Sequence, residues 1–342
     1  MNLSEGLGYS RLSPHEQQVY KIALKAFSSM EASFNISKMH TSVDLMKVVN
    51  TVLGDNPTVI YFNKTQIQKV ESIFEKQAEL TGILPKSQIN KMNLELEQKS
   101  NQIVSSIKTG TTDDYSLLLR IYEFLQSNVC YDTQEFNNII SNGKTANPFS
   151  HNAYGALLNG LAVCDGYSSA LSLLLNKSGY ESMSAIGELT QIPSVCVMHA
   201  WNIVRVRNRY YHMDATSDSK AYSQFGGLSY NYFALDDTEI AYNHNWDINT
   251  TPACSYNDFS YFLKNGLFVN NITQCSDIIR SSLKKQDDCI RIKLSDNIAL
   301  PENIEEYLAQ TIMTEAGNRG ILMRIKYYWN AQTRCFFGKF LI

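Results

Sequence analysis

Three residues with complementary chemistry occur along the chain in the order Cys164, His199 and Asp214. A thiol, an imidazole and a carboxylate are together able to transfer an acyl group. The imidazole takes the proton of the thiol, and the carboxylate orients the imidazole and stabilises its cation. The sequence therefore predicts a catalytic unit in which Cys164 is the nucleophile, His199 the general base and then acid, and Asp214 the orienting group.

The residues that follow Cys164 predict a helix that begins at the cysteine itself. Apolar residues recur there at helical spacing, at Tyr167, Ala170, Leu171 and Leu174. The free N–H groups and aligned dipoles at a helix start stabilise an anion, which favours a reactive thiolate and makes the Cys164 N–H an oxyanion donor. Gly160 and Gly166 are expected to let a substrate backbone approach the thiol. A buried, unreactive cysteine is the alternative interpretation.

The segments on either side of Arg207-Asn208 alternate like strands, so a two-residue turn at this point predicts a hairpin. Such a turn places Asp214 on the same face as His199, diagonally across the ladder at roughly 7–8 Å between Cα atoms. One hydrogen bond between the two side chains can bridge that gap. A histidine and an aspartate in a solvated hairpin, without a joint function, is the alternative.

A metal site is a further interpretation, because His212 shares this face with His199 and Asp214. Zinc would need a third or fourth ligand, and Cys164 or His151 are the nearby suggestions. A helix-borne cysteine is explained better as a nucleophile. The sequence therefore predicts that no metal is bound.

The composition is that of a soluble globular protein, with 342 residues, 44% hydrophobic and 18% charged residues, and a net charge of -3. A nucleic-acid or anionic-membrane partner usually requires a basic excess, so neither is expected. No apolar run approaches the ~20 residues of a membrane-spanning helix. The first 16 residues contain no apolar stretch of signal-peptide length, so a cytoplasmic location is expected, or a secreted one if a signal segment was lost.

The cysteines are seven, an odd number, at irregular spacing and without a C-x-x-C pair. This pattern argues against a structural zinc site and against a disulfide framework. Most of these cysteines lie among apolar residues and are expected to be small buried hydrophobic residues.

The chain length predicts two or three domains. Residues 1–111 are interpreted as a mainly helical region, 112–250 as the catalytic domain and 251–342 as a small α/β domain. The last part shows the order helix, strand, helix, strand, strand, at 272–283, 289–294, 302–315, 320–329 and 333–341.

Local signals subdivide the first two parts. Ser13 and Glu16 form a capping box at the first helix, and Asp113 or Asp114 caps a later one. A second amphipathic segment covers about 43–53. The remaining expectations are a short strand at 58–62, a polar helix-favouring stretch at 65–107, and loops at 137–150 and 217–230.

Several motifs occur in an order that resembles the bacterial transglutaminase-like superfamily. They are Ala153-Tyr154-Gly155-Ala156-Leu157 with Ala162-Val163-Cys164-Asp165-Gly166-Tyr167, then His199-Ala200-Trp201-Asn202, Asp214-Ala215-Thr216 and His244-Asn245-Trp246-Asp247. The resemblance covers about residues 112–250. The chain departs from the family where Ala215-Thr216-Ser217 replaces the common Val-Thr-Trp, which removes an aromatic wall.

The resemblance implies an α+β fold with a papain-like core, in which the cysteine helix packs on an antiparallel sheet that carries His199 and Asp214. It also implies a thioester at Cys164, no cofactor, and a protein or peptide amide as substrate. Trp201 and Tyr154 are expected to line the substrate site, or else to pack in the core. The family includes transglutaminases, deamidases and peptidases, so the acceptor stays open. A non-catalytic peptide-binding or assembly module is the rival function. The oligomeric state is not indicated.

Overall fold

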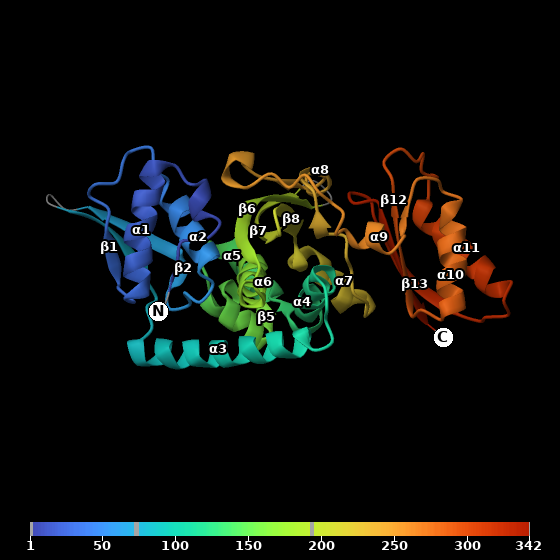
Figure 1. The fold of residues 1–342 in the computed structure, drawn as a ribbon, viewed down its shortest axis with the longest axis horizontal. Helices are drawn as coiled ribbons and strands as arrows, with labels where there is room; N and C mark the ends of the chain where they lie inside the picture. The colour runs from blue at the N-terminus through green and yellow to red at the C-terminus, as the bar shows by residue number, and fades with distance from the viewer. Residues whose placement is uncertain (1–2, 72–74, 192–194, 342) are drawn as a thin grey trace.

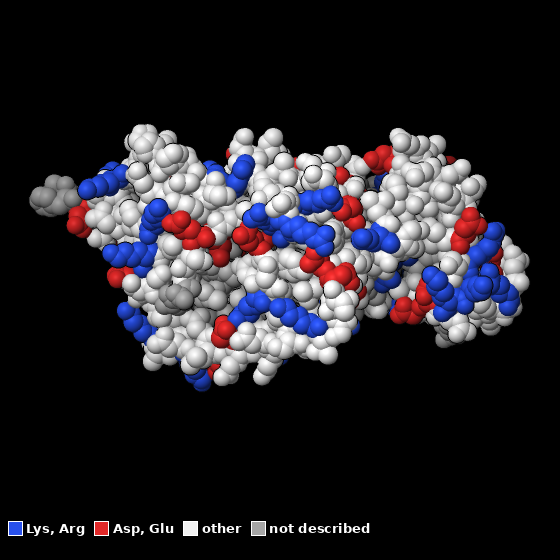
Figure 2. Space-filling model, viewed as in Figure 1, with Lys and Arg blue, Asp and Glu red and all other residues white. Residues whose placement is uncertain are grey.

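The computed structural model describes residues 3–71, 75–191 and 195–341. Its three parts follow one another along the long axis, from the N-terminal part through the central part to the C-terminal part (Figure 1). Helices and mostly antiparallel sheets are combined in each part, which confirms the predicted α+β class. Among the described helices, none is both long and apolar enough to cross a membrane. Acidic and basic side chains are intermixed on the face shown in Figure 2.

The N-terminal part combines helices with a small sheet. Its elements are η1 (Tyr9–Arg11), α1 (Pro14–Ser28), β1 (Ser33–Asn35), α2 (Leu45–Asp55), β2 (Asn63–Glu71), β3 (Lys76–Thr81) and α3 (Lys86–Lys108). The predicted capping box of Ser13 and Glu16 is confirmed. The helix-favouring interpretation is wrong for residues 65–71 and 76–81, where β2 and β3 join β1 in an antiparallel sheet, and residues 72–74 lie outside the described residues. Residues 58–62 do not form a strand. Residues 68–71 are exposed on this sheet, so their polar composition resembles that of a helix surface.

The central part contains the predicted cysteine helix on an antiparallel sheet. Its helices are α4 (Asp114–Asn128), α5 (Thr133–Asn142), η2 (Pro148–His151), η3 (Gly155–Asn159), α6 (Cys164–Ser178), α7 (Ala215–Phe225), α8 (Asp237–Ile240) and η4 (Ile248–Thr250). Its strands are β4 (Cys130–Tyr131), β5 (Leu161–Ala162), β6 (Glu181–Gln191), β7 (Val195–Val206), β8 (Arg209–Met213), β9 (Phe233–Leu235) and β10 (His244–Asn245). Five of the strands form a sheet in the order β10-β6-β7-β8-β9, and α6 packs against β6 and β7.

Helix α6 is held in place by its apolar face. Tyr167, Ala170, Leu171 and Leu174 are buried, as their spacing predicts. A fully buried leucine contributes about 1.5–3 kcal/mol to the free energy of unfolding. The start of α6, with Cys164, is therefore fixed relative to the sheet by the packing of the turns that follow.

Two segments predicted as loops contain helices instead. Helix α5 overlaps the loop predicted at 137–150, and α7 overlaps the one predicted at 217–230. Asp132 caps α5 by accepting a hydrogen bond from the Glu135 N–H, and Gly143 ends it with a φ of 63°. One of the residues that indicated the first loop, Gly143, is therefore the C-terminal stop of a helix.

The C-terminal part has its own apolar core, which runs from Val269 to Phe340. Its elements are α9 (Tyr261–Lys264), β11 (Phe268–Val269), α10 (Gln274–Lys285), β12 (Cys289–Leu294), α11 (Ile304–Gly317), β13 (Arg324–Asn330) and β14 (Cys335–Leu341). The sheet order is β11-β12-β14-β13, and α10 and α11 pack against it. The predicted order of helices and strands is confirmed. The boundaries 1–111, 112–250 and 251–342 stay predictions.

Candidate active site

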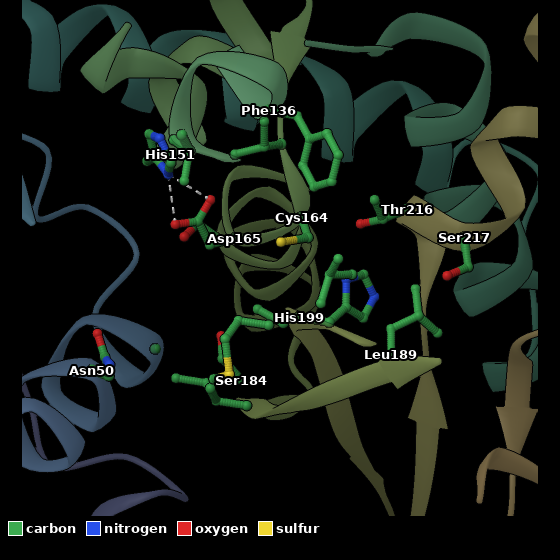
Figure 3. Close-up of a pocket in the computed structure, with 18 of the residues that line it drawn as sticks. Asn50, Phe136, His151, Cys164, Asp165, Ser184, Leu189, His199, Thr216 and Ser217 are labelled. Carbon is green, nitrogen blue, oxygen red and sulfur yellow. Dashed lines mark hydrogen bonds and ion pairs between the residues drawn. The ribbon is translucent and has the colours of Figure 1, made fainter. Parts of the chain in front are cut away.

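Cys164 is the first residue of α6 and lines a cavity of about 520 Å³. Within the described residues, no side chain caps this helix start, so its N–H groups are not used up by a neighbouring side-chain acceptor. The thiol and the ring of His199 lie side by side at the centre of the cavity (Figure 3). The geometry therefore offers a nucleophile, a base and backbone donors at one point.

The two glycines beside Cys164 shape the chain itself. A Cβ at Gly166 would lie 2.2 Å from the carbonyl oxygen of Ser150, so only glycine lets the η2 backbone pass the first turn of α6. Gly160 adopts a φ of 67°, in the left-handed region that favours glycine. The expectation that Gly160 and Gly166 admit a substrate backbone is wrong, because both positions serve the path of this chain.

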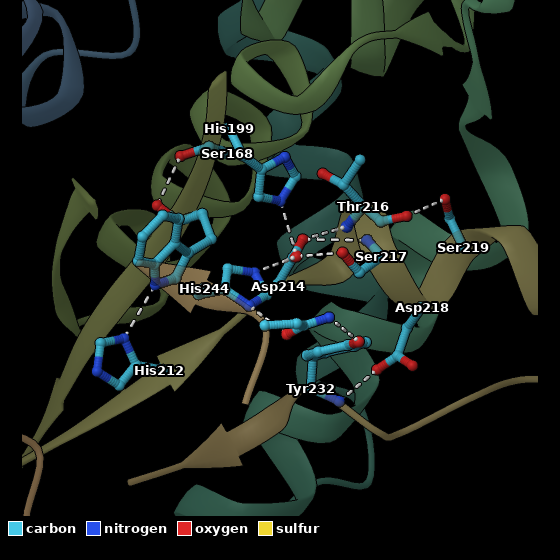
Figure 4. A network of polar contacts seen from close by, with 12 residues as sticks. Ser168, His199, His212, Asp214, Thr216, Ser217, Asp218, Ser219, Tyr232 and His244 are labelled. Carbon is cyan, nitrogen blue, oxygen red and sulfur yellow. Dashed lines mark hydrogen bonds and ion pairs between the residues drawn. The ribbon is translucent and has the colours of Figure 1, made fainter. Parts of the chain in front are cut away.

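His199 and Asp214 meet as the hairpin argument predicts. The pairing of Val206 with Arg209 confirms the two-residue turn, in which Arg207 takes the positive φ, 57°. The Nε2 atom of His199 lies 2.8 Å from Oδ2 of Asp214 (Figure 4). This bond orients the imidazole with its other nitrogen, Nδ1, free to serve the thiol.

Asp214 is a buried acceptor for several donors. Its Oδ1 accepts the N–H groups of Thr216 and Ser217, each at 3.0 Å, so it also caps α7. Its Oδ2 accepts hydrogen bonds from His199, from His244 at 3.1 Å and from the hydroxyl of Ser217. The serine that departs from the family pattern thus supplies a hydroxyl that stabilises the carboxylate.

The electrostatics of this pair favour the charged forms. Burial lowers the pKa of His199, but the charge and hydrogen bond of Asp214, together with the interaction with Cys164, raise it to about 10. Burial raises the pKa of Asp214, but the charge and hydrogen bond of His199 and the bond from His244 hold it well below its ordinary value. The pair is therefore a carboxylate and an imidazolium at neutral pH. The interaction with the Cys164 thiol places this charged pair directly beside the proposed nucleophile.

His244 is a site residue that the sequence reasoning missed. It comes from β10, the edge strand beside β6, and donates to Asp214 from the side opposite the cavity (Figure 4). Burial lowers the pKa of His244, and the hydrogen bond and charge of Asp214 oppose that lowering. A carboxylate can only accept, so Nε2 is the donor to Asp214, while Nδ1 lies 2.7 Å from Oδ1 of Asn243. The signal was its place in the motif with Trp246, which was interpreted only as the end of the domain.

Trp201 and Tyr154 do not line the cavity, so their assignment to the substrate site is wrong. Trp201 is 1% exposed and its ring lies parallel to that of His199, with centroids 6.1 Å apart. Its Nε1 donates to Nδ1 of His212 at 2.9 Å, which fixes that second imidazole. The hydroxyl of Tyr154 donates to Glu95 of α3 at 2.7 Å, because η3 turns this side chain toward α3. Both aromatic residues support the site by packing.

His212 does not join His199 and Asp214, because its Nε2 lies 2.8 Å from Asp237. Among the described residues, two groups have ligand atoms within 4.8 Å of one another: His199 with Asp214 and His244, and His212 with Asp237 and Cys254. In both groups the histidine–carboxylate pairs are joined by hydrogen bonds, which account for the short distances without a metal ion.

A second histidine, His151, lines the cavity on the far side of Cys164. Its Nδ1 lies 2.9 Å from Asp165 (Figure 3), and its Nε2 lies 3.1 Å from Glu135 of α5. This bridge ties α5 to the first turn of α6. It holds the carboxylate next to the cysteine away from the thiol and toward the cavity wall.

The cavity is formed by segments far apart in the sequence. Helix α2 of the N-terminal part supplies Met46, Asn50, Leu53 and Gly54. The central part supplies Tyr131, Phe136, Ile139, Ile140, His151, Val163, Cys164, Asp165, Ser169, Ser184, Ile186, Leu189, Cys196, Val197, Met198, His199, Ala200, Thr216 and Ser217. Most of these side chains are apolar, and His199 lies near the thiol whereas Asn50 lies on the far wall (Figure 3).

Comparison with known proteins finds similarity over part of the chain. Residues 101–215 match the family model described as the Transglutaminase-like superfamily. Two solved structures are similar to the chain, each at 12% sequence identity. One, described as a TGase, has a TM-score of 0.33 over 44% of this chain and 44% of that one. The other, a putative cysteine protease from Cytophaga hutchinsonii, has a TM-score of 0.28 over 44% of this chain and 61% of that one. The chain thus spans about half the length of the structures that it matches. No curated protein matches it.

Proposed function

We propose that this chain, whose residues 101–215 match the model of the Transglutaminase-like superfamily, transfers an acyl group from a protein or peptide amide through a thioester at Cys164. One observation carries the proposal. The hydrogen-bonded pair of His199 and Asp214 lies beside Cys164, at a helix start with no side-chain cap among the described residues, in an open cavity.

In the first step, the Cys164 sulfur attacks the amide carbonyl carbon and a tetrahedral intermediate forms. The Cys164 N–H at the start of α6 is placed to donate to its oxyanion, because the aligned dipoles of the helix favour a negative charge there. The C–N bond then breaks. His199 Nδ1 gives its proton to the departing amine, and the thioester remains on Cys164.

In the second step, an acceptor attacks the thioester. His199, now neutral, takes a proton from that acceptor, and the C–S bond breaks to regenerate the thiolate and imidazolium. Asp214 keeps Nε2 protonated through both steps, because its own donors fix it in place. With an amine as acceptor the result is a transglutaminase, with water a deamidase or a peptidase.

The test uses a glutamine-rich protein such as casein, with and without a fluorescent primary amine. We expect the wild-type protein to give amine incorporation, conversion of glutamine to glutamate or new peptide termini, and Cys164→Ala to give none of the three. Cys130→Ala is the matched control and should keep the activity, because this exposed cysteine does not line the cavity. A wild-type protein inactive in all three assays, with an unreactive Cys164, would instead favour the non-catalytic peptide-binding or assembly module.

A further inference from the structure

Large apolar side chains are exposed around the mouth of the Cys164 cavity. Met46, Ile140, Ile186 and Met198 are 36%, 63%, 39% and 68% exposed, and all four line the cavity. They come from α2, α5, β6 and β7, so no single element accounts for their exposure. Scattered exposed apolar residues are ordinary on soluble proteins, but a group that surrounds one concave site marks a place where an apolar ligand binds.

Helix α2 forms one wall of this cavity, and its position is fixed. At Gly54 the helix comes so close to β6 that a Cβ would lie 3.1 Å from the Cβ of Ser184. The next residue, Asp55, is buried and accepts hydrogen bonds from the N–H groups of Gly8 and Tyr9. The N-terminal part therefore presents a rigid surface to the thiol.

The charges in the cavity do not suit an ionic ligand. Of the lining residues that the structure describes, none is a lysine or an arginine, and the one carboxylate, Asp165, is engaged by His151. The other polar groups on the walls around the thiol include the amide of Asn50 on α2 and the hydroxyl of Ser184 on β6, which also shares a hydrogen bond with the hydroxyl of Ser168 (Figure 3). These groups can form hydrogen bonds with the backbone of a bound peptide, whereas an alkyl chain has no hydrogen-bonding groups.

We propose that the acyl donor is a peptide segment with a large aliphatic or aromatic side chain next to the reacting amide, and that this side chain packs between α2 and the exposed residues of α5 and β7. The proposal rests on the acyl-transfer function and names its substrate class. The cavity of about 520 Å³ holds more than one amide group, and it lies within the ~300–1,000 Å³ of ligand pockets. Helix α2, which lies outside the segment that matches the family, becomes a determinant of specificity.

The test measures how peptides protect Cys164 from iodoacetamide. Two probes are compared, acetyl-Leu-Gln-Gly-amide and acetyl-Asp-Gln-Gly-amide, at about pH 8, where even an ordinary thiol reacts. We expect the leucine peptide to protect at concentrations about 10- to 100-fold lower, because a leucine side chain leaves water. Protection reports only whether the peptide occupies the cavity. The peptides can therefore fail to protect although Cys164 is catalytic, and they can protect although Cys164 is inert, so the two proposals are tested separately.

Variants place the effect in the cavity. Met198→Asp and Ile140→Asp should bring the ratio of the two protecting concentrations close to one. Ile248→Asp and Leu94→Asp are the controls and should leave the ratio unchanged, since these residues are 69% and 64% exposed and lie outside the cavity lining. The proposal would be overturned if the two peptides protected equally, or if control and cavity variants had equal effects. It would also be overturned if octanoyl-glycine, which offers an alkyl chain in place of a peptide, protected better than the leucine peptide.

Discussion

The substitution Asp214→Asn removes the charge that keeps His199 an imidazolium while it keeps almost the same volume. The pKa of His199 is about 10 beside Asp214, against an ordinary 6.5. At about 1.4 kcal/mol for each pH unit, this difference favours the imidazolium by ~5 kcal/mol. In the variant, the charge of Asp214 no longer opposes burial and only the interaction with Cys164 still raises the pKa of His199, so this pKa falls. We therefore expect a larger neutral fraction of the imidazole at pH 7.

Two assays follow this change. The rate at which iodoacetamide alkylates Cys164 at about pH 6 should fall by at least about tenfold in Asp214→Asn, because a smaller fraction of imidazolium then favours the thiolate. Turnover should fall by about one to two orders of magnitude, less than on removal of Cys164 or His199, because a cysteine–histidine pair can form its ion pair before substrate arrives. An unchanged alkylation rate in a folded variant would refute the reasoning.

Stability gives an independent readout with a defined pH dependence. The lowered pKa of Asp214 gives a stabilisation that is present above its ordinary value of 3.8 and lost as the pH falls below it. The raised pKa of His199 gives one that is complete below 6.5 and lost as the pH rises through about 10. The free energy of unfolding should therefore differ most between wild type and Asp214→Asn from about pH 4 to 6.5, by about 3–5 kcal/mol for a broken buried pair. A difference independent of pH would contradict the ion pair.

Further substitutions separate chemistry from packing. Cys164→Ala should abolish acyl transfer, and His199→Ala should be nearly as damaging. The thermal unfolding of Cys164→Ala should stay close to that of the wild type, because the half-buried thiol is not part of the apolar core. Gly166→Ala should lower the free energy of unfolding by about 2 kcal/mol or more, because its Cβ would lie 2.2 Å from a carbonyl oxygen. Gly317→Ala, which has no atom within 4 Å of its Cβ position, is the control and should not be destabilised; equal losses in the two glycine variants, measured by urea denaturation, would count against the close contact.

The sequence was sufficient for those parts of the site that depend on local spacing. The helical spacing of the apolar residues after Cys164 predicted the start of α6. The two-residue turn predicted the contact between His199 and Asp214. Both depend on residues close in the chain, whose geometry is set by the regular period of a helix or a hairpin.

The errors lie where structure depends on distant contacts. The direction of Trp201 and Tyr154 depends on packing against His212 and α3, which spacing does not reveal. His244 reaches Asp214 from an edge strand thirty positions away. The polar strands and the asparagine-rich helix were predicted wrongly, because the intrinsic helix or strand propensity of a residue is a weak signal. Solvent exposure and capping residues determine which element forms there.

The wall that α2 gives to the cavity was equally hidden. It rests on the approach of Gly54 to Ser184, two residues that no local pattern connects. Prediction of such a contact requires knowledge of how the N-terminal and central parts pack. The residues that we propose as catalytic were thus accessible from the sequence, whereas the surface that we propose to select the substrate was not.

The measurement that tests the central claim most directly is the rate at which iodoacetamide alkylates each cysteine of the folded chain at about pH 6. Mass spectrometry identifies which cysteines are labelled at each time. Cys130 and Cys196 are exposed, whereas Cys164 is half-buried. Accessibility alone would therefore make Cys164 the slowest of the three to be alkylated. Burial raises the pKa of Cys275 and Cys289 to about 11 and that of Cys335 to about 12, so these three should not react. We predict that Cys164 reacts at least about tenfold faster than Cys130 and Cys196. Equal rates for the three, or a Cys164 slower than the other two, would contradict the assignment of Cys164 as the nucleophile.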